Sequence, residues 1–101
     1  MAKAGKSSGK VRAVKLGEDL RIGSAKAAFE ALRGAAAKPE KQVALDAREV
    51  EKVDAAGLQA LLAGRTALAQ AGKTVTWNGV SAQLGAAAGL LGLSESLGLP
   101  R

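Results

Sequence analysis

The stretch Val43-Ala-Leu-Asp-Ala-Arg-Glu-Val-Glu-Lys-Val-Asp-Ala-Ala-Gly-Leu-Gln-Ala-Leu-Leu62 decides the fold, because it predicts a buried strand followed closely by a helix. The apolar run that opens it and ends at Asp46 is typical of a short strand. Asp54 comes just before an apolar pattern at helical spacing, and an aspartate there accepts hydrogen bonds from the free backbone N–H groups of the first turn. We therefore expect a strand over 43–46 and a helix over 55–70, with Asp54 at the rim of a sheet.

The segments on either side predict the rest of an α/β fold. Residues 73–77 alternate and are rich in β-branched side chains, which favours a strand. A strand, helix and strand with short connections form a right-handed crossover, so the two strands should be parallel. Apolar spacing predicts an earlier helix that begins at Ser24, its N-cap, and buries Phe29 in the core. Ser81 is expected to cap a third helix, and residues 94–99 to add one last turn.

Two further short strands are expected near the start of the domain, over 11–16 and 20–22, separated by a turn signal at residues 17–19. We expect this pair to form an antiparallel hairpin at one edge of the sheet. The dipeptide Asn78-Gly79 predicts a turn that ends the later strand. Together these elements predict a mixed sheet of about four strands, with three helices packed mainly on one face.

Composition limits the chain to one domain and leaves few routes to catalysis. The chain has 101 residues, no cysteine, no histidine and a net charge of +6. The absent residue types exclude disulfides, thiolate chemistry and the commonest general base. No apolar run is long enough to span a membrane and no apolar signal core opens the chain, so a cytoplasmic protein is expected. We expect residues 1–10 to be a flexible basic arm and 11–101 to form the domain.

Candidate catalytic groups are scarce. Asp46 and Asp54 could approach each other as a carboxylate pair. The interpretation we favour is that Asp54 caps its helix and Asp46 accepts hydrogen bonds from loop N–H groups. The sequence contains no cluster of metal ligands, no phosphate loop and no dinucleotide fingerprint. No enzyme activity, metal or cofactor is therefore expected.

The segment Val53-Asp-Ala-Ala-Gly-Leu58 resembles the STAS domain, the fold of bacterial anti-sigma factor antagonists, whose pattern is Asp-[Ser/Thr]-[Ser/Thr/Ala]-Gly-Leu. Ala71-Gly-Lys-Thr-Val-Thr-Trp77 is similar to the strand that follows in the family. Leu90-Leu-Gly-Leu-Ser-Glu-Ser-Leu-Gly-Leu99 is similar to its closing segment. The resemblance covers residues 11–99 and implies a STAS-like sheet. In switching members the hydroxyl directly after the aspartate is phosphorylated, but this chain has Ala55 there.

The resemblance implies a protein-interaction module in bacterial signalling. The partner would be an anti-sigma factor or a kinase-like regulator, chemotaxis regulators included. Because Ala55 has no hydroxyl, binding should not be switched by phosphate at the family site. Small uncharged residues at the helix start would let a partner approach the backbone closely, beside a polar loop. The predicted partner-binding residues are Arg48, Glu51, Asp54, Ala55, Ala56, Gly57 and Leu58.

Two alternative functions, each with a different partner, are also compatible with the sequence. Some STAS proteins resemble accessory subunits of lipid-transport ATPase complexes at the inner membrane, which would keep the fold and change the partner. The basic arm could instead bind nucleic acid or an anionic membrane. The arm has no aromatic residue to stack on bases, which argues against nucleic acid.

Overall fold

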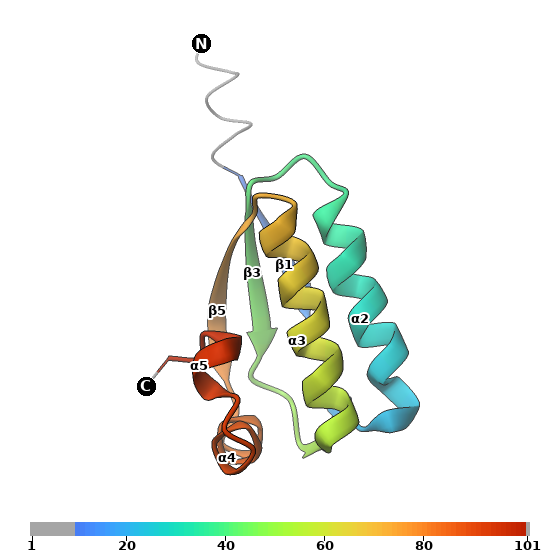
Figure 1. The fold of residues 1–101 in the computed structure, drawn as a ribbon, viewed down its shortest axis with the longest axis vertical. Coiled ribbons are helices and arrows are strands. Elements are labelled where there is room, and N and C mark those ends of the chain that lie inside the picture. The colour runs from blue at the N-terminus through green and yellow to red at the C-terminus, as the bar shows by residue number, and fades with distance from the viewer. Residues whose placement is uncertain (1–9, 101) are drawn as a thin grey trace.

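A computed structural model describes residues 10–100 as a parallel sheet with two long helices side by side across one face (Figure 1). The α/β class predicted from the sequence is confirmed. In chain order the elements are β1 (Val11–Lys15), β2 (Asp19–Leu20), α2 (Ile22–Ala36), β3 (Gln42–Ala47), β4 (Lys52–Val53), α3 (Ala55–Gln70), β5 (Thr74–Val80), α4 (Ala82–Leu90) and α5 (Ser94–Leu97).

The main sheet has the strand order β1-β3-β5, and both pairs of neighbours are parallel. Helix α3 connects β3 with β5, so the predicted parallel crossover is confirmed. Along β1 and β5 exposed residues alternate with partly buried ones, because the helices cover one face of the sheet. This arrangement brings the starts of all three strands to one end of the domain and their ends to the other.

The predicted antiparallel hairpin is wrong. Strand β1 pairs in parallel with β3, and β2 pairs in parallel with β4 as a separate two-stranded ladder. The chain between β1 and β2 does not fold back into the main sheet. Instead, the Glu18 carbonyl accepts hydrogen bonds from the backbone N–H groups of Glu51 and Lys52, at 2.8 and 3.0 Å. A contact between residues distant in sequence therefore decides where β2 lies.

The core lies between the helices and the covered face of the sheet. Its fully buried large side chains come from every layer: Leu20, Leu32, Val43, Leu45, Val50, Leu58, Leu61, Leu68, Leu84 and Leu97. Phe29, expected among them, is only partly buried and lies outside this cluster, so that prediction is wrong. On α2 the buried residues are Ala28, Leu32 and Ala35. The buried face of α2 is therefore formed by one leucine and two alanines, and the ring of Phe29 is not part of it.

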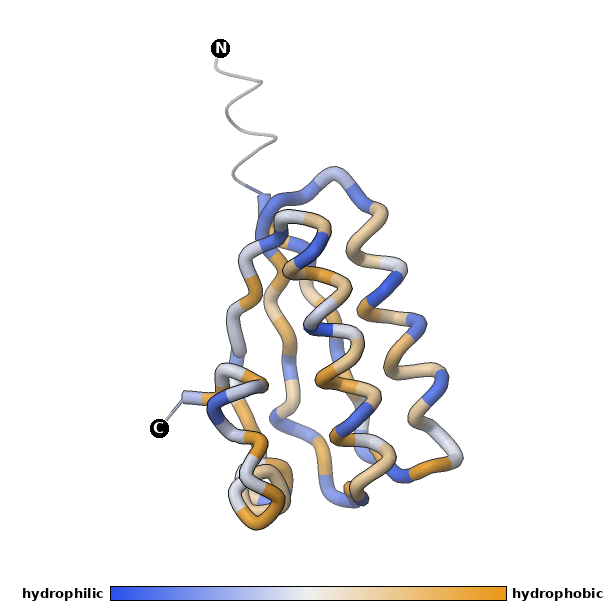
Figure 2. Tube along the Cα trace, in the orientation of Figure 1, coloured by the Kyte–Doolittle hydropathy of each residue, from blue (hydrophilic) through white to orange (hydrophobic). Residues whose placement is uncertain are grey.

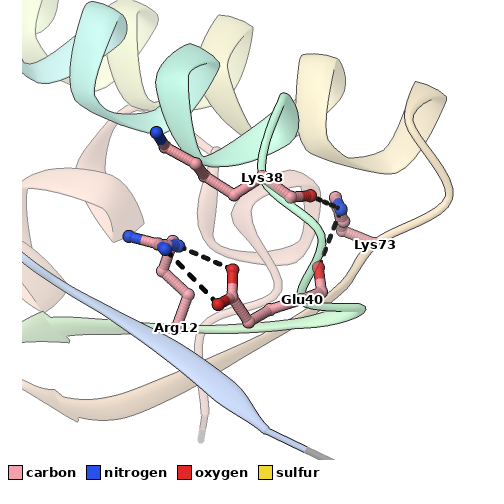
Figure 3. Close-up of polar contacts among 4 residues, drawn as sticks. All are labelled: Arg12, Lys38, Glu40 and Lys73. Atoms are coloured by element: carbon pink, nitrogen blue, oxygen red, sulfur yellow. Dashed lines mark hydrogen bonds and ion pairs between the residues drawn. The ribbon is translucent and has the colours of Figure 1, made fainter. Parts of the chain in front are cut away.

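Polar contacts hold the connection between α2 and β3 to the starts of β1 and β5 (Figure 3). The Nε atom of Arg12 donates to Glu40 at 2.9 Å. Lys73 donates from Nζ to two backbone carbonyls, those of Lys38 and Glu40. One lysine side chain thus connects the start of β5 to two carbonyls of this connection.

Two glycines allow α3 to approach its neighbours closely. A Cβ atom on Gly57 would lie 1.6 Å from the carbonyl oxygen of Leu20, and one on Gly64 would lie 2.7 Å from the Leu32 side chain. The first contact is with backbone, which cannot move aside as a flexible side chain can. Gly57 therefore fixes how close the first turn of α3 lies to the end of β2.

Replacing Gly57→Ala should destabilise the domain by about 3 kcal/mol, because the added methyl group displaces the backbone of β2. Gly85→Ala is the matched control, since Gly85 is also helical and its Cβ would have no neighbour within 4 Å. That control should stabilise by about 0.5–1 kcal/mol through helix propensity. Urea denaturation of both variants measures the difference, and equal effects of the two substitutions would disprove the close approach.

Candidate functional site

The carboxylate of Asp54 joins the first turns of α2 and α3. One oxygen, Oδ1, accepts from the backbone N–H of Gly57 at 2.9 Å, which caps α3 as predicted. The other, Oδ2, accepts from the backbone N–H of Ile22 at 2.9 Å, and Ile22 is the first residue of α2. A single side chain thus serves two helices that are 32 positions apart in the sequence.

This shared carboxylate explains where α2 begins. Ser24 is not the N-cap: α2 starts at Ile22, and Arg21 occupies the cap position without a side-chain cap hydrogen bond. Neither first turn contains an acidic residue, and the Asp54 carboxylate lies at the positive ends of both helix dipoles. The local serine signal is overridden because a distant aspartate supplies the acceptor.

The surface around Asp54 is narrower than the sequence suggests. Ala55 is exposed, and Ala56 and Asp54 are partly exposed. Gly57 and Leu58 are buried, Leu58 completely, so neither presents a side chain to a partner. These two residues of the predicted contact set lie within the packed part of α3.

Sequence reasoning missed Ile22, whose side chain is 75% exposed. Its backbone N–H donates to Asp54, the residue that immediately precedes Ala55. Its position was hidden by the expected helix start at Ser24, which placed Ile22 in a strand. Exposed apolar residues mark a contact surface where several lie together in one patch. We define the docking surface as Ile22, Asp54, Ala55 and Ala56.

An Asp-x-Arg pattern occurs twice at this end of the domain with the same local geometry. Asp46 accepts from the backbone N–H of Arg48 at 3.1 Å and from its guanidinium at 3.0 and 2.8 Å. Asp19 accepts from the backbone N–H and guanidinium of Arg21 in the same way. The predicted role of Asp46, accepting from loop N–H groups, is confirmed.

These hydrogen bonds change the acidity of both aspartates. The guanidinium of Arg48 lowers the pKa of Asp46 from 3.8 to about 2, and the hydrogen bond from its backbone N–H adds to the effect. Desolvation acts in the opposite direction but is smaller, although Asp46 is only 9% exposed. The guanidinium of Arg21 likewise lowers the pKa of Asp19 to about 2. Both carboxylates are therefore fixed anions with an arginine partner, which does not suit a general acid.

Arg48 and Glu51 lie at the edge of this region, and no hydrogen bond or ion pair within residues 10–100 links Arg48 with Asp54. The stem of Arg48 lies over Gly79 of β5, where a Cβ atom would come within 2.3 Å of it. Gly79 has a φ of +109° and continues β5, so the predicted turn at Asn78-Gly79 is wrong. Glu51 is exposed, while the neighbouring Val50 is fully buried and anchors the loop.

Across the described part of the chain, no three His, Cys, Asp or Glu side chains gather as potential metal ligands. No helix between residues 10 and 100 combines the length and apolar character needed to cross a bilayer. The arrangement at Asp54 offers a small apolar surface with fixed charges nearby, which can bind a protein but has no reactive group.

Comparison with known proteins identifies the fold family. A family model described as "Mlab, STAS domain" matches residues 4–100. The chain belongs to the STAS domain family. A search of curated proteins gave no match. The crystal structure of a sulfate transporter family protein from Wolinella succinogenes superposes on this STAS domain with a TM-score of 0.72 and 24% identity, over 86% of this chain and 70% of that one. STAS domains are generally binding modules.

Replacing Asp54→Ala should cost about 1–2 kcal/mol, the usual loss for an N-cap carboxylate. Asp54→Asn should cost less, because its one carbonyl oxygen can replace Oδ1 but not Oδ2. Amide hydrogen exchange separates the two bonds. Exchange at Ile22 should accelerate in both variants, and exchange at Gly57 only in Asp54→Ala. Unchanged exchange at Ile22 in Asp54→Ala would show that the carboxylate does not hold α2.

The low pKa of Asp46 predicts an acid-dependent loss of stability. Between pH 3.8 and about 2 the unfolded chain binds a proton at this residue that the folded chain does not, so stability falls as the pH decreases through this window. In Asp46→Asn the free energy of unfolding should depend less steeply on pH in this window, because the contribution of Asp46 is removed. Arg48→Gln should reduce the slope similarly. Denaturant titrations at several pH values measure the slope. A slope equal to that of the wild type in both variants contradicts the assignment.

Proposed function

We propose that this STAS domain is a non-catalytic docking module in bacterial signalling, which binds an anti-sigma factor or a kinase-like regulator, chemotaxis regulators included, through its docking surface. The observation that carries the proposal is that two exposed apolar residues adjoin Asp54: Ile22 donates its backbone N–H to the carboxylate, and Ala55 is the next residue in the chain. The proposed site is cytoplasmic.

The docking surface is suited to close contact with another protein. Ala55 and Ala56 are small, so a partner can approach the backbone at the start of α3, and Ile22 can insert into an apolar pocket of the partner. Asp54 is held by two backbone N–H groups and does not need to reorganise on binding. A preorganised surface lowers the entropic cost of association.

The surrounding charges supply a polar edge for the same contact. Glu51, three positions before Asp54, is exposed. Arg48, which comes earlier in the same loop, is also exposed. Charges at the rim of an interface affect association rate and partner choice more than affinity. Arg48 is held in a fixed position by Asp46, so it can serve as an oriented charge rather than a mobile one.

The position of Ala55 determines how binding is regulated. It is exposed at the first residue of α3, the position at which the family pattern has a hydroxyl. A phosphate there would add nearly two negative charges to an uncharged surface beside Asp54. Alanine has no hydroxyl to accept a phosphate. Phosphorylation at the family's acceptor position therefore does not switch binding at this surface.

A charge at residue 55 tests the docking surface directly. Ala55→Glu should abolish capture of the partner while leaving the fold intact, because a glutamate in the first turn of a helix is favourable for the dipole. Ala31→Glu is the matched control, since Ala31 is exposed near the middle of α2 and the charge change is identical. Affinity capture with the wild type and both variants, followed by mass spectrometry, gives the comparison. Thermal unfolding confirms that each variant is folded.

The outcomes separate the candidate partners. Capture of an anti-sigma factor or kinase-like protein by the wild type and Ala31→Glu, and not by Ala55→Glu, supports the proposal. Capture of a transport ATPase with the same pattern would support the docking surface but change the partner. The chain would then be an accessory subunit of a transport ATPase complex. Equal capture by all three chains would place the binding surface elsewhere.

A further inference from the structure

Three lysines stand in a row at the end of the domain opposite the docking surface. Lys10, Lys41 and Lys73 immediately precede β1, β3 and β5. The first paired residues of these strands are in register, Val11 with Gln42 and Gln42 with Thr74. Parallel neighbours are about 4.8 Å apart, so the row spans about 10 Å. The parallel topology therefore aligns lysines that are separated by about thirty residues in the sequence.

Further basic residues surround this row. Arg12 and Lys38 lie in the contacts that hold the connection before β3 (Figure 3). Arg33 is in the last turn of α2. In Figure 1 the connections before β3 and β5 and the start of β1 meet at the top of the view, and Figure 2 shows this region as mainly hydrophilic. We call this region the basic end; it comprises Lys10, Arg12, Arg33, Lys38, Lys41 and Lys73.

The charge of the basic end is poorly compensated. Its one acidic residue is Glu40, whose carboxylate is bound by Arg12. Lys73 is held by neutral carbonyls, which leave its charge in place. Lys10, Lys38 and Lys41 are exposed. The other described residues contain six basic and eight acidic groups, so the positive charge of the domain is concentrated at this end.

We propose that the basic end docks the domain electrostatically on an anionic lipid bilayer. Four to eight lysines and arginines in one cluster are typical of a surface that binds anionic lipids, and each contributes to the attraction. Four of the six residues here are lysines, whose flexible stems suit a plane of headgroups. Val11, half exposed beside Lys10, adds an apolar contact at the same end.

Features expected of a nucleic-acid site are missing from the basic end. The two aromatic residues of the chain are elsewhere: Phe29 lies about two turns before the end of α2, and Trp77 donates from Nε1 to the carbonyl of Leu97. Helices α2 and α3 both end here rather than start here. No described helix starts at this end to enter a groove.

Docking through the basic end would leave the docking surface pointing away from the bilayer. The starts of α2 and α3 lie at the opposite end of the same helices whose last turns border the basic end (Figure 1). Membrane and protein partner could then bind simultaneously. The two sites share no residue, so each can be tested without altering the other.

Vesicle co-sedimentation of the full chain provides the test. The triple variant Lys10→Gln, Lys38→Gln, Lys41→Gln should bind vesicles of phosphatidylglycerol and phosphatidylethanolamine roughly a hundredfold more weakly than the wild type. The control triple variant Lys15→Gln, Lys26→Gln, Lys52→Gln loses the same charge from exposed positions elsewhere and should bind nearly as well as the wild type. Vesicles of phosphatidylcholine alone should not bind any of the chains.

Other outcomes would overturn the proposal. An equal loss in both triple variants would mean that net charge, and not this end, governs binding. If deletion of residues 2–9 abolished vesicle binding while the first triple variant still bound, the lipid contact would be assigned to residues 2–9 and not to the basic end. Tighter binding to a single- or double-stranded DNA oligonucleotide than to the anionic vesicles at the same salt concentration would assign the basic end to nucleic acid.

The orientation can be measured independently, because the chain has no cysteine. Gln42→Cys places an environment-sensitive dye at the start of β3, and Gln59→Cys places it on α3 near the docking surface; both glutamines are exposed. Anionic vesicles should shift the emission of the first label and leave the second unchanged. A shift at residue 59 alone would contradict this mode of docking.

Discussion

The structure depends on one carboxylate that satisfies backbone donors in two helices. Asp54 accepts from Gly57 in its own helix and from Ile22 at the start of α2. The first N–H groups of a helix have no partner within it, and the charge of Asp54 suits two converging positive dipole ends. Close packing through Gly57 brings β2 and α3 into contact at the same place. The relative position of the two helices, and with it the exposure of Ile22 and Ala55, follows from this arrangement.

The parallel topology gives the two ends of the domain different chemistry. Strand ends and helix starts meet around Asp54, where carboxylates are paired with arginines and two small helix residues remain at the surface. Strand starts and helix ends meet at the other end, where lysines precede each strand of the main sheet. The proposed protein contact and the proposed membrane contact therefore occupy opposite ends. A binding module whose two contacts lie at opposite ends can hold a protein partner at a defined distance from the surface of a charged bilayer.

Several features could be predicted because they depend on neighbouring residues alone. The limits of α3, the Asp54 cap, the Ser81 cap of α4 and the parallel crossover all follow from local spacing and short connections, and the structure confirms them. The family pattern around Asp54 located the centre of the candidate site. Errors arose where a distant group competed with a local signal. Ser24 lost its capping role to Asp54, and the expected hairpin gave way to a pairing of β2 with β4.

By itself, then, the sequence determined the α/β class, the main helix, its aspartate cap and the uncharged residue at the family's acceptor position. The first three rest on periodicity or on hydrogen bonds within one turn, and the last rests on the resemblance to the family pattern. Only the tertiary structure decided that Leu58 is in the core, that Ile22 is at the surface, and that Lys10, Lys41 and Lys73 form a row. Burial and register are set by contacts between segments far apart in the chain, and local spacing does not encode those contacts.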